Sequence, residues 1–134
     1  MKIGAYQAPL LPIGSMEAID LIRTQIARCE NEEIEILCCP EAILGDLADS
    51  AADPAHVAVS VENGQLEEVL APLSSKTVST IIGFTESTST GQLYNSAAVL
   101  DRGSLIGLYR KAHPRSTRRS TTQATMCQRL QLGP

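Results

Sequence analysis

Two residues whose side chains could perform acid–base chemistry each follow a stretch of sequence that is typical of a β-strand. Glu41 comes after the apolar run 34–39 and Pro40, and Lys111 comes directly after the run 104–110. A carboxylate can accept a proton from a nucleophile, and an ammonium group can stabilise negative charge that develops on a substrate. The two strand ends therefore predict a single site. A covalent reaction there would need a third group, a nucleophile.

Cysteine would be the obvious nucleophile, and the chain has four, at positions 29, 38, 39 and 127. Cys38 and Cys39 are adjacent and would point to opposite faces of a strand, which does not fit the disulfide framework of a secreted protein. The sequence has neither a C-x-x-C pair nor Cys and His at zinc-ligand spacing, so no metal ion or organic cofactor is implied. We expect buried, reduced and unreactive thiols in a cytoplasmic protein.

The residues before Glu41 predict a strand, a helix and a second strand. Residues 2–8 alternate loosely and read as a short strand, and Ser15 is the expected N-cap of the helix. The helix has one apolar stripe, formed by Met16, Ile19, Ile22, Ile26 and Cys29. Residues 34–39 form a nearly continuous apolar run, typical of a central parallel strand that is buried on both faces. The two strands of such a unit are parallel neighbours, and active groups usually lie just beyond their carboxyl ends, where Glu41 falls.

Between Glu41 and Lys111 the sequence predicts a second helix and three more strands. Residues 45–54 lack a clear period and are expected to be irregular, with room for a short helix. The apolar spacing from Leu66 to Leu73 predicts the helix. The strands are expected at 78–84, 93–100 and 104–110, with a polar turn at 85–92 and a tight hairpin turn at 101–103. The hairpin would end by presenting Lys111.

The charge of the chain is distributed unevenly. The net charge of the 134 residues is −4, but residues 115–134 contain four Arg and no acid, so residues 1–114 carry 7 basic and 15 acidic residues, a net of −8. We therefore divide the chain into a domain, 1–114, and a basic tail, 115–134, whose lack of an apolar period predicts disorder. Four arginines without interleaved aromatic residues beside so acidic a domain do not favour nucleic-acid binding.

No run approaches the roughly 18 apolar residues that a membrane helix needs.

Five short motifs follow one another in an informative order. They are Lys-Ile-Gly-Ala-Tyr-Gln at 2–7, Cys-Pro-Glu at 39–41, Ile-Ile-Gly-Phe-Thr-Glu at 81–86, Leu-Tyr-Asn-Ser-Ala at 93–97 and Tyr-Arg-Lys-Ala-His-Pro at 109–114. Their joint order and spacing resemble the N-terminal half of the nitrilase, or carbon-nitrogen hydrolase, superfamily. The resemblance implies the α/β class and the N-terminal portion only of a nitrilase-like α-β-β-α sandwich, most often assembled as a homo-oligomer.

The resemblance also implies a chemistry and its residues. The family hydrolyses small amides or nitriles with a cysteine nucleophile, a glutamate and a lysine, and by resemblance Glu41 is the glutamate and Lys111 the lysine. The carboxylate would take the proton of the thiol, which then attacks the substrate carbon. The ammonium group would stabilise the developing charge. After ammonia or an amine has left to give a thioester, the same carboxylate would activate the water that hydrolyses it.

The nucleophile of the family has no matching residue in this sequence. In the family it lies in an elbow after a further strand, whereas Cys127 is only sixteen positions past Lys111, with no strand pattern before it and no acid after it. Cys38 and Cys39 do not match either. The second glutamate of the family is also missing, since residues 115–134 contain no acid. The comparison implies a chain that is truncated or frame-shifted in this region and inactive alone.

Four other residues near the motifs have less specific interpretations. We expect Glu86 to be an exposed loop acid and His113 to be a structural or solvated imidazole. Tyr94 and Asn95 are expected to fix a local turn or to support the site.

Two functional hypotheses remain open. The chain is a carbon-nitrogen hydrolase acting on an amide or nitrile, or it is a non-catalytic binding or assembly module that retains half of the fold, with open strand edges and exposed apolar faces.

Overall fold

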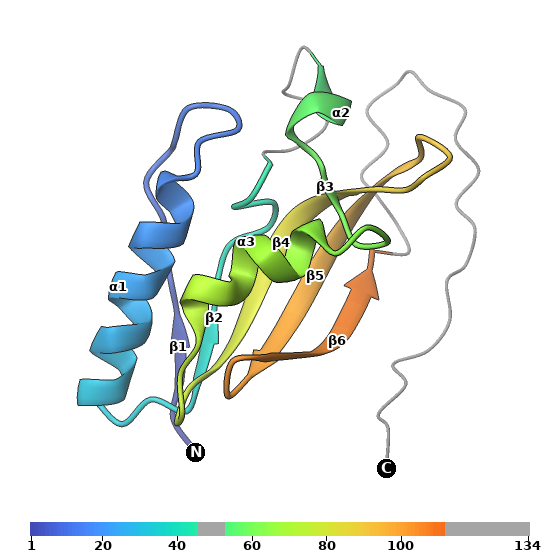
Figure 1. The fold of residues 1–134 in the computed structure, drawn as a ribbon. Coiled ribbons are helices and arrows are strands. Elements are labelled where there is room, and N and C mark those ends of the chain that lie inside the picture. The colour runs from blue at the N-terminus through green and yellow to red at the C-terminus, as the bar shows by residue number, and fades with distance from the viewer. Residues whose placement is uncertain (46–52, 112–134) are drawn as a thin grey trace.

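The computed structural model describes residues 1–45 and 53–111, and these form a single sheet with its helices on one face (Figure 1). The strands are β1 (Ile3–Ala5), β2 (Ile36–Cys38), β3 (Val59–Ser60), β4 (Ser79–Ser87), β5 (Leu93–Asp101) and β6 (Ser104–Arg110). The helices are α1 (Glu17–Asn31), α2 (Pro54–Val57) and α3 (Gln65–Leu70), and a 3-10 turn, Ala71–Leu73, follows α3. The predicted tail, with Cys127, and His113 lie outside the described residues, so the division at residue 114 stays a prediction.

The predicted β-α-β unit is confirmed. β1 and β2 are parallel neighbours, with Ile3 opposite Ile36. Between them α1 packs an apolar stripe against the sheet, and its buried residues are Ala18, Ile19, Ile22, Ile26 and Cys29. Met16, which was expected in this stripe, precedes the helix and is 55% exposed. The Ser15 hydroxyl accepts a hydrogen bond from the Glu17 amide, but the residue at the cap position is Met16, one position later than predicted.

The second half of the sheet is antiparallel. The strand order is β1-β2-β4-β5-β6, where β2 and β4 are parallel and the β4–β5 and β5–β6 pairs are antiparallel. β5 and β6 turn at Arg102 and Gly103, whose φ angles of 49° and 79° place both in the left-handed region that a tight hairpin requires. The carboxyl ends of β2 and β6 therefore point the same way, upward in Figure 1. The hairpin is confirmed, and it brings residues 41 and 111 to one end of the sheet.

Two details of the middle of the chain differ from the prediction. The expected polar turn at 85–92 is too long, because β4 continues to Ser87 and only the last residues form the turn. A sixth strand, β3, was not predicted; it pairs parallel with the end of β4, opposite Glu86 and Ser87. With two residues, β3 is too short to produce a recognisable alternation in the sequence.

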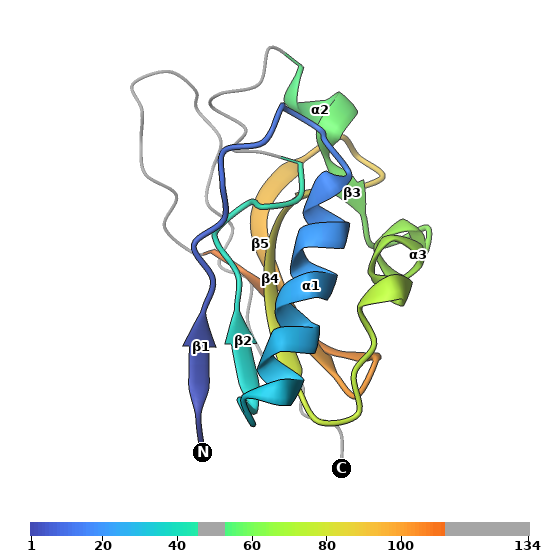
Figure 2. The same ribbon diagram turned by 90° about the vertical axis from the view of Figure 1, so that its left-hand side faces the viewer.

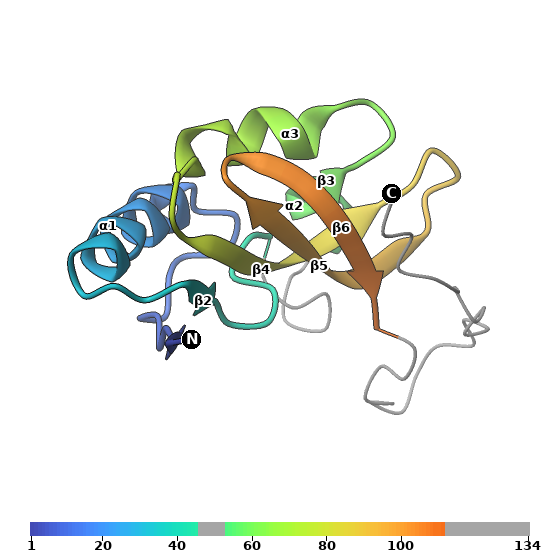
Figure 3. The same ribbon diagram turned by 90° about the horizontal axis from the view of Figure 1, so that it is seen from below.

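The main core lies on the helical face of the sheet. Figure 2 and Figure 3 show α1 and α3 side by side on that face, with β4 beneath them. Phe84 and Ile82 of β4 and Leu37 of β2 are buried there, whereas the flanking Ile36 and Cys38 are only partly buried. The prediction that 34–39 is buried on both faces is therefore wrong, because no second layer of the described chain covers the opposite face, which we call the open face.

No helix in residues 1–45 and 53–111 combines the length and the apolar character needed to cross a membrane. The longest, α1, has 15 residues and carries charged groups along its exposed side.

With its helices on one face of a single sheet, the described chain supplies one α layer and one β layer, which is half of the sandwich expected from the sequence.

Candidate active site

Glu41 lies on a segment that leaves β2 and crosses over β4. The Cys39 amide donates to the Ile81 carbonyl (2.8 Å), and the Leu44 amide donates to the Gly83 carbonyl (3.2 Å). The residues between these two bonds have no ladder of their own and rise from the sheet. Glu41 is therefore placed above the open face, just past the end of β2.

Gly83 allows this segment to lie directly on β4. A Cβ atom at Gly83 would stand 2.5 Å from the Pro40 carbonyl oxygen, 2.7 Å from the Ala42 nitrogen and 2.8 Å from the Glu41 Cα. All three contacts would be with backbone atoms, which cannot turn aside as a side chain can. Ala42 itself has a φ of 48°, in the left-handed region that alanine seldom occupies. The close approach and the strained turn together hold Glu41 at one position over the sheet.

Lys111 is positioned by continuation of the β5–β6 ladder. Ser96 lies opposite Arg110, and one step further the Lys111 amide donates to the Asn95 carbonyl at 2.8 Å. Lys111 and Asn95 are thus cross-strand neighbours. Because neighbouring residues of a strand alternate between faces, both side chains rise on the open face.

The three side chains meet at one oxygen atom. The Lys111 Nζ lies 2.5 Å from Glu41 Oε1, and Asn95 Nδ2 donates to the same oxygen at 2.5 Å. The Glu41 and Lys111 side chains are 48% and 38% exposed, so a dissolved molecule can reach the pair. The prediction that the two strand ends meet is confirmed, and Asn95 contacts the same carboxylate. The supporting role that we expect for Asn95 stays a prediction. The catalytic roles of Glu41 and Lys111 are a separate matter and stay a prediction.

Glu86 lies on the opposite face of the sheet and is buried, so the expectation of an exposed loop acid is wrong. Its side chain is only 2% exposed. Arg110 donates two hydrogen bonds to its carboxylate, from Nε to Oε2 (2.9 Å) and from Nη2 to Oε1 (2.5 Å), and the Ser96 hydroxyl donates a third (2.6 Å). The guanidinium also lies over the Tyr94 ring, 4.2 Å from its centre. Glu86 follows Ile82 and Phe84 at a spacing of two, which is the signal that could have placed it on the buried face.

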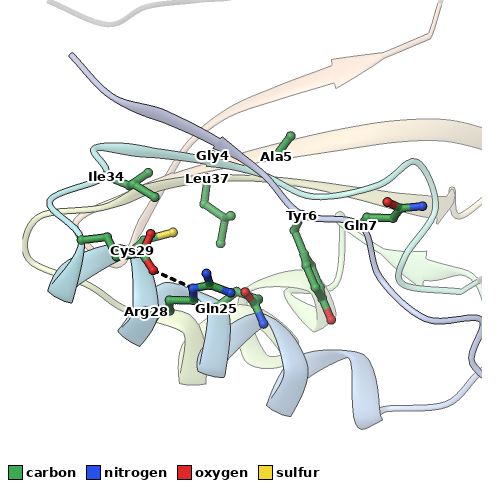
Figure 4. A pocket seen from close by; sticks show the side chains of 10 residues that line it. Gly4, Ala5, Tyr6, Gln7, Gln25, Arg28, Cys29, Ile34 and Leu37 are labelled. Carbon is green, nitrogen blue, oxygen red and sulfur yellow. Dashed lines mark hydrogen bonds and ion pairs between the residues drawn. The ribbon is translucent and has the colours of Figure 1, made fainter.

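The described cysteines are free thiols, and two of them lie in environments that oppose thiolate formation. Burial raises the pKa of Cys39 to about 12, with smaller contributions from Cys38 and Cys29. Burial also raises the pKa of Cys29, which lines a hollow of about 380 Å³ between α1 and β1, shown in Figure 4 beside the paired Arg28. The expectation of unreactive thiols fits these two residues, although Cys38 and Cys39 are only partly buried.

Within the described ranges, no three His, Cys, Asp or Glu side chains gather closely enough to hold a metal ion. The Glu41 site instead offers one carboxylate, one ammonium group and one amide. These groups can exchange a proton and can stabilise an anion next to a substrate. They do not supply a nucleophile.

Solved structures with a similar fold define the class of this protein. A carbon-nitrogen hydrolase from Helicobacter pylori G27 superposes with a TM-score of 0.63 at 20% identity, over 84% of this chain and 40% of that one. A glutamine-dependent NAD(+) synthetase from Cytophaga hutchinsonii gives 0.63 at 20% identity, over 83% and 19%. An N-terminal amidase with a Gln-Gly peptide gives 0.59 at 26% identity, over 78% and 26%. The fold is that of the nitrilase-like α-β-β-α sandwich, and the described chain is an N-terminal portion of it.

The family follows from the sequence itself. The profile of the carbon-nitrogen hydrolase family matches residues 2–130, so the chain belongs to the carbon-nitrogen hydrolase family. No curated protein sequence matches the chain. The chain spans less than half the length of the three similar structures. The predicted family and fold are confirmed.

Proposed function

We propose that Glu41 and Lys111 are the general base and the charge-stabilising cation of a carbon-nitrogen hydrolase site that acts on an amide, with a nitrile as the second substrate class. The observation that supports this proposal is the shared Glu41 oxygen, where an ammonium group and an amide group from β6 and β5 converge. Amides come first because the similar structures include an amidase and a glutamine-dependent synthetase.

The geometry suggests how each group would act. The Glu41 carboxylate lies at an exposed strand end, where it can accept the proton of an attacking thiol and later that of a water molecule. The Lys111 ammonium group lies beside it and can stabilise the negative charge on the substrate oxygen or nitrogen. Asn95 binds the carboxylate by its amide and limits the positions that the carboxylate can take. The substrate carbon would then be bound on the open face between the carboxylate and the ammonium group.

The nucleophile would come from outside the described part of the chain. Cys39 packs against the core, and its raised pKa of about 12 leaves little thiolate near neutral pH. Cys127 lies outside the described residues, and its sequence context does not match the family elbow. We therefore propose that the chain alone binds the substrate class but does not turn it over. A homo-oligomeric state and a cytoplasmic location belong to the same proposal.

A second function, a non-catalytic binding or assembly module, is favoured by the open face of the sheet. Ile3 and Tyr109 on that face are 58% and 55% exposed, and no layer of the described chain covers them. Exposed apolar residues of this size on a sheet are typical of a surface that another polypeptide covers. In this case the Glu41–Lys111 pair would be a structural ion pair.

Ligand titration followed by NMR distinguishes the two functions. Small amides and nitriles are added to the chain while the Lys111 ammonium and Asn95 side-chain amide signals are recorded. We expect shifts that saturate and that are reduced in Glu41→Gln, but not in Glu30→Gln, which removes a carboxylate of α1. Intact-mass measurement in parallel should show no thioester adduct.

Two results would contradict this proposal. If no amide or nitrile shifts the Lys111 and Asn95 signals, the pair does not bind the substrate class, and the module is favoured. If an adduct forms and disappears in Cys127→Ala, the chain does supply its own nucleophile, and our rejection of Cys127 is wrong. The adduct would still support the hydrolase assignment.

A further inference from the structure

The last residue of β6 and the residue after it, Arg110 and Lys111, extend to opposite faces of the sheet. Arg110 reaches the buried carboxylate of Glu86 on the helical face, and Lys111 reaches Glu41 on the open face. Consecutive residues of an extended chain share a rigid backbone, so whatever fixes Arg110 also limits the positions of Lys111. The contact of Lys111 with Glu41 therefore has a counterpart directly beneath it.

The counterpart is an ion pair between the buried Glu86 carboxylate and the partly buried Arg110 guanidinium. Two parallel N–H···O bonds join the Arg110 guanidinium to the carboxylate, which fixes the orientation of both groups as well as their distance. The Ser96 hydroxyl binds Oε2 as well, and the Tyr94 ring lies against the guanidinium. These two residues belong to β5, so Arg110 passes over the whole width of β5 to reach β4.

This crossing is important because β6 lies at the edge of the sheet. Within the described chain β6 pairs with β5 alone, and its ladder ends one residue past Arg110, at the Lys111 amide. The end of an edge strand with one neighbour opens more easily than an inner strand. The Glu86–Arg110 pair ties this end to β4, which is two strands further in.

Both members of the Glu41–Lys111 pair are thus held in place by contacts with the same strand, β4. Glu41 rests on β4 through the bare backbone of Gly83, and Lys111 is held to β4 through Glu86, three residues further along. We propose that Glu86 is a positioning residue that, through Arg110, holds the Lys111 ammonium group at the Glu41 carboxylate. This inference rests on the proposed function, because it gives a role at that site to a pair on the other face.

The experiment measures the Glu41–Lys111 contact rather than activity. The chain has three lysines, at positions 2, 76 and 111, so their side-chain ammonium and Cε signals can be assigned by single substitutions. The quantity measured is the shift of the Lys111 signals that Glu41→Gln causes. We expect this shift to be large in the wild-type background and to fall by at least about half in the Glu86→Gln background, since coupled residues lose additivity.

Hydrogen exchange gives a second readout. We expect the Lys111 amide, which donates to Asn95, to exchange at least about tenfold faster in Glu86→Gln while the amides of β1 and β2 keep their rates. Glu30→Gln is the matched control, because Glu30 accepts a hydrogen bond from the Ser75 hydroxyl but lies on α1, away from β6. It should leave both the Lys111 shift and the Lys111 exchange rate unchanged.

Milder variants decide the question if Glu86→Gln unfolds the chain. Arg110→Lys keeps the charge but loses the two-bond fork, and Ser96→Ala removes a single hydrogen bond. Each variant should reduce the shift of the Lys111 signals that Glu41→Gln causes, but by less than Glu86→Gln does. We expect the reduction to be larger in Arg110→Lys than in Ser96→Ala.

The possible failures are distinct. If Glu41→Gln shifts Lys111 equally in the wild-type, Glu86→Gln and Arg110→Lys backgrounds, the buried pair only stabilises the fold, and the inference is overturned while the proposed function stands. If Glu41→Gln does not shift Lys111 even in the wild-type background, the pair itself is not formed. That result would overturn the proposed function and this inference with it.

Discussion

Replacement of Gly83 by alanine tests whether the position of Glu41 depends on close packing against β4. The new Cβ would lie 2.5 Å from the Pro40 carbonyl oxygen, so that oxygen would have to retreat by about 0.9 Å to reach the 3.4 Å of ordinary contact. The Ala42 nitrogen and the Glu41 Cα would be displaced by similar amounts. Because Glu41 Oε1 is 2.5 Å from Lys111 Nζ and from Asn95 Nδ2, a displacement of this size would lengthen those hydrogen bonds to as much as about 3.4 Å and weaken them.

The size of the effect follows from the cost of overpacking. Inserting a methyl group into a filled space costs about 1–3 kcal/mol of unfolding free energy. For a domain of this size, that corresponds to a fall in Tm on the order of 5–15 °C. The stability is measured by thermal and denaturant unfolding, and the position of Glu41 is measured by the Lys111 ammonium signal.

Gly107→Ala is the matched control for this variant. Gly107 lies in β6, and its Cβ would meet only the Val99 side chain, at 3.8 Å. Alanine here should be neutral or should stabilise by about 0.4–1 kcal/mol, since it reduces the freedom of the unfolded chain. If Gly83→Ala unfolds at the same temperature as Gly107→Ala and leaves the Lys111 signal in place, our reasoning on the Glu41 segment is refuted.

Two further predictions concern titratable groups. The raised pKa of Cys39, about 12 instead of 9.0, should make its alkylation at pH 8 about a thousandfold slower in the folded than in the unfolded chain; equal rates by mass spectrometry would contradict its burial. Hydrogen bonds from the Ser89 side chain and then its amide lower the pKa of Glu62 below 4.5, so the carboxylate stabilises the fold above that pH and loses this effect as pH falls through its folded pKa. Glu62→Gln should therefore lower Tm at pH 7, and this loss should shrink steadily as the pH falls below 4.5; a loss of Tm that does not change with pH would refute the linkage.

The elements with a strong local signal were predicted correctly from the sequence. The stripe of α1 repeats every three or four residues, and Gly103 marks a turn between two alternating strands, so both features are readable without knowledge of the fold. The meeting of Glu41 and Lys111 was also predicted, because strand ends in such sheets converge. These predictions needed only periodicity and topology.

The features that the sequence did not reveal depend on contacts between distant residues. Glu86 was misplaced because its charge favoured solvent, and the cation that compensates this charge in the fold, Arg110, lies 24 positions later in the sequence. The function of Gly83 was missed because a glycine in a strand has several possible reasons, and the segment that lies on it is separate in sequence. The incomplete burial of Ile36 and Cys38 was missed because the apolar run suits a strand covered on both faces.

The long sequence separations within the site have a consequence for the order of folding. Glu41 is 54 residues from Asn95 and 70 residues from Lys111. The β5–β6 hairpin closes through a two-residue turn, so Asn95 and Lys111 can meet early, at a small loss of chain entropy. Glu41 joins them only after β2 has paired with β4, a step of high contact order that is expected to be slow. The Glu41 contacts are therefore expected among the last to form, and their appearance would report that the sheet is complete.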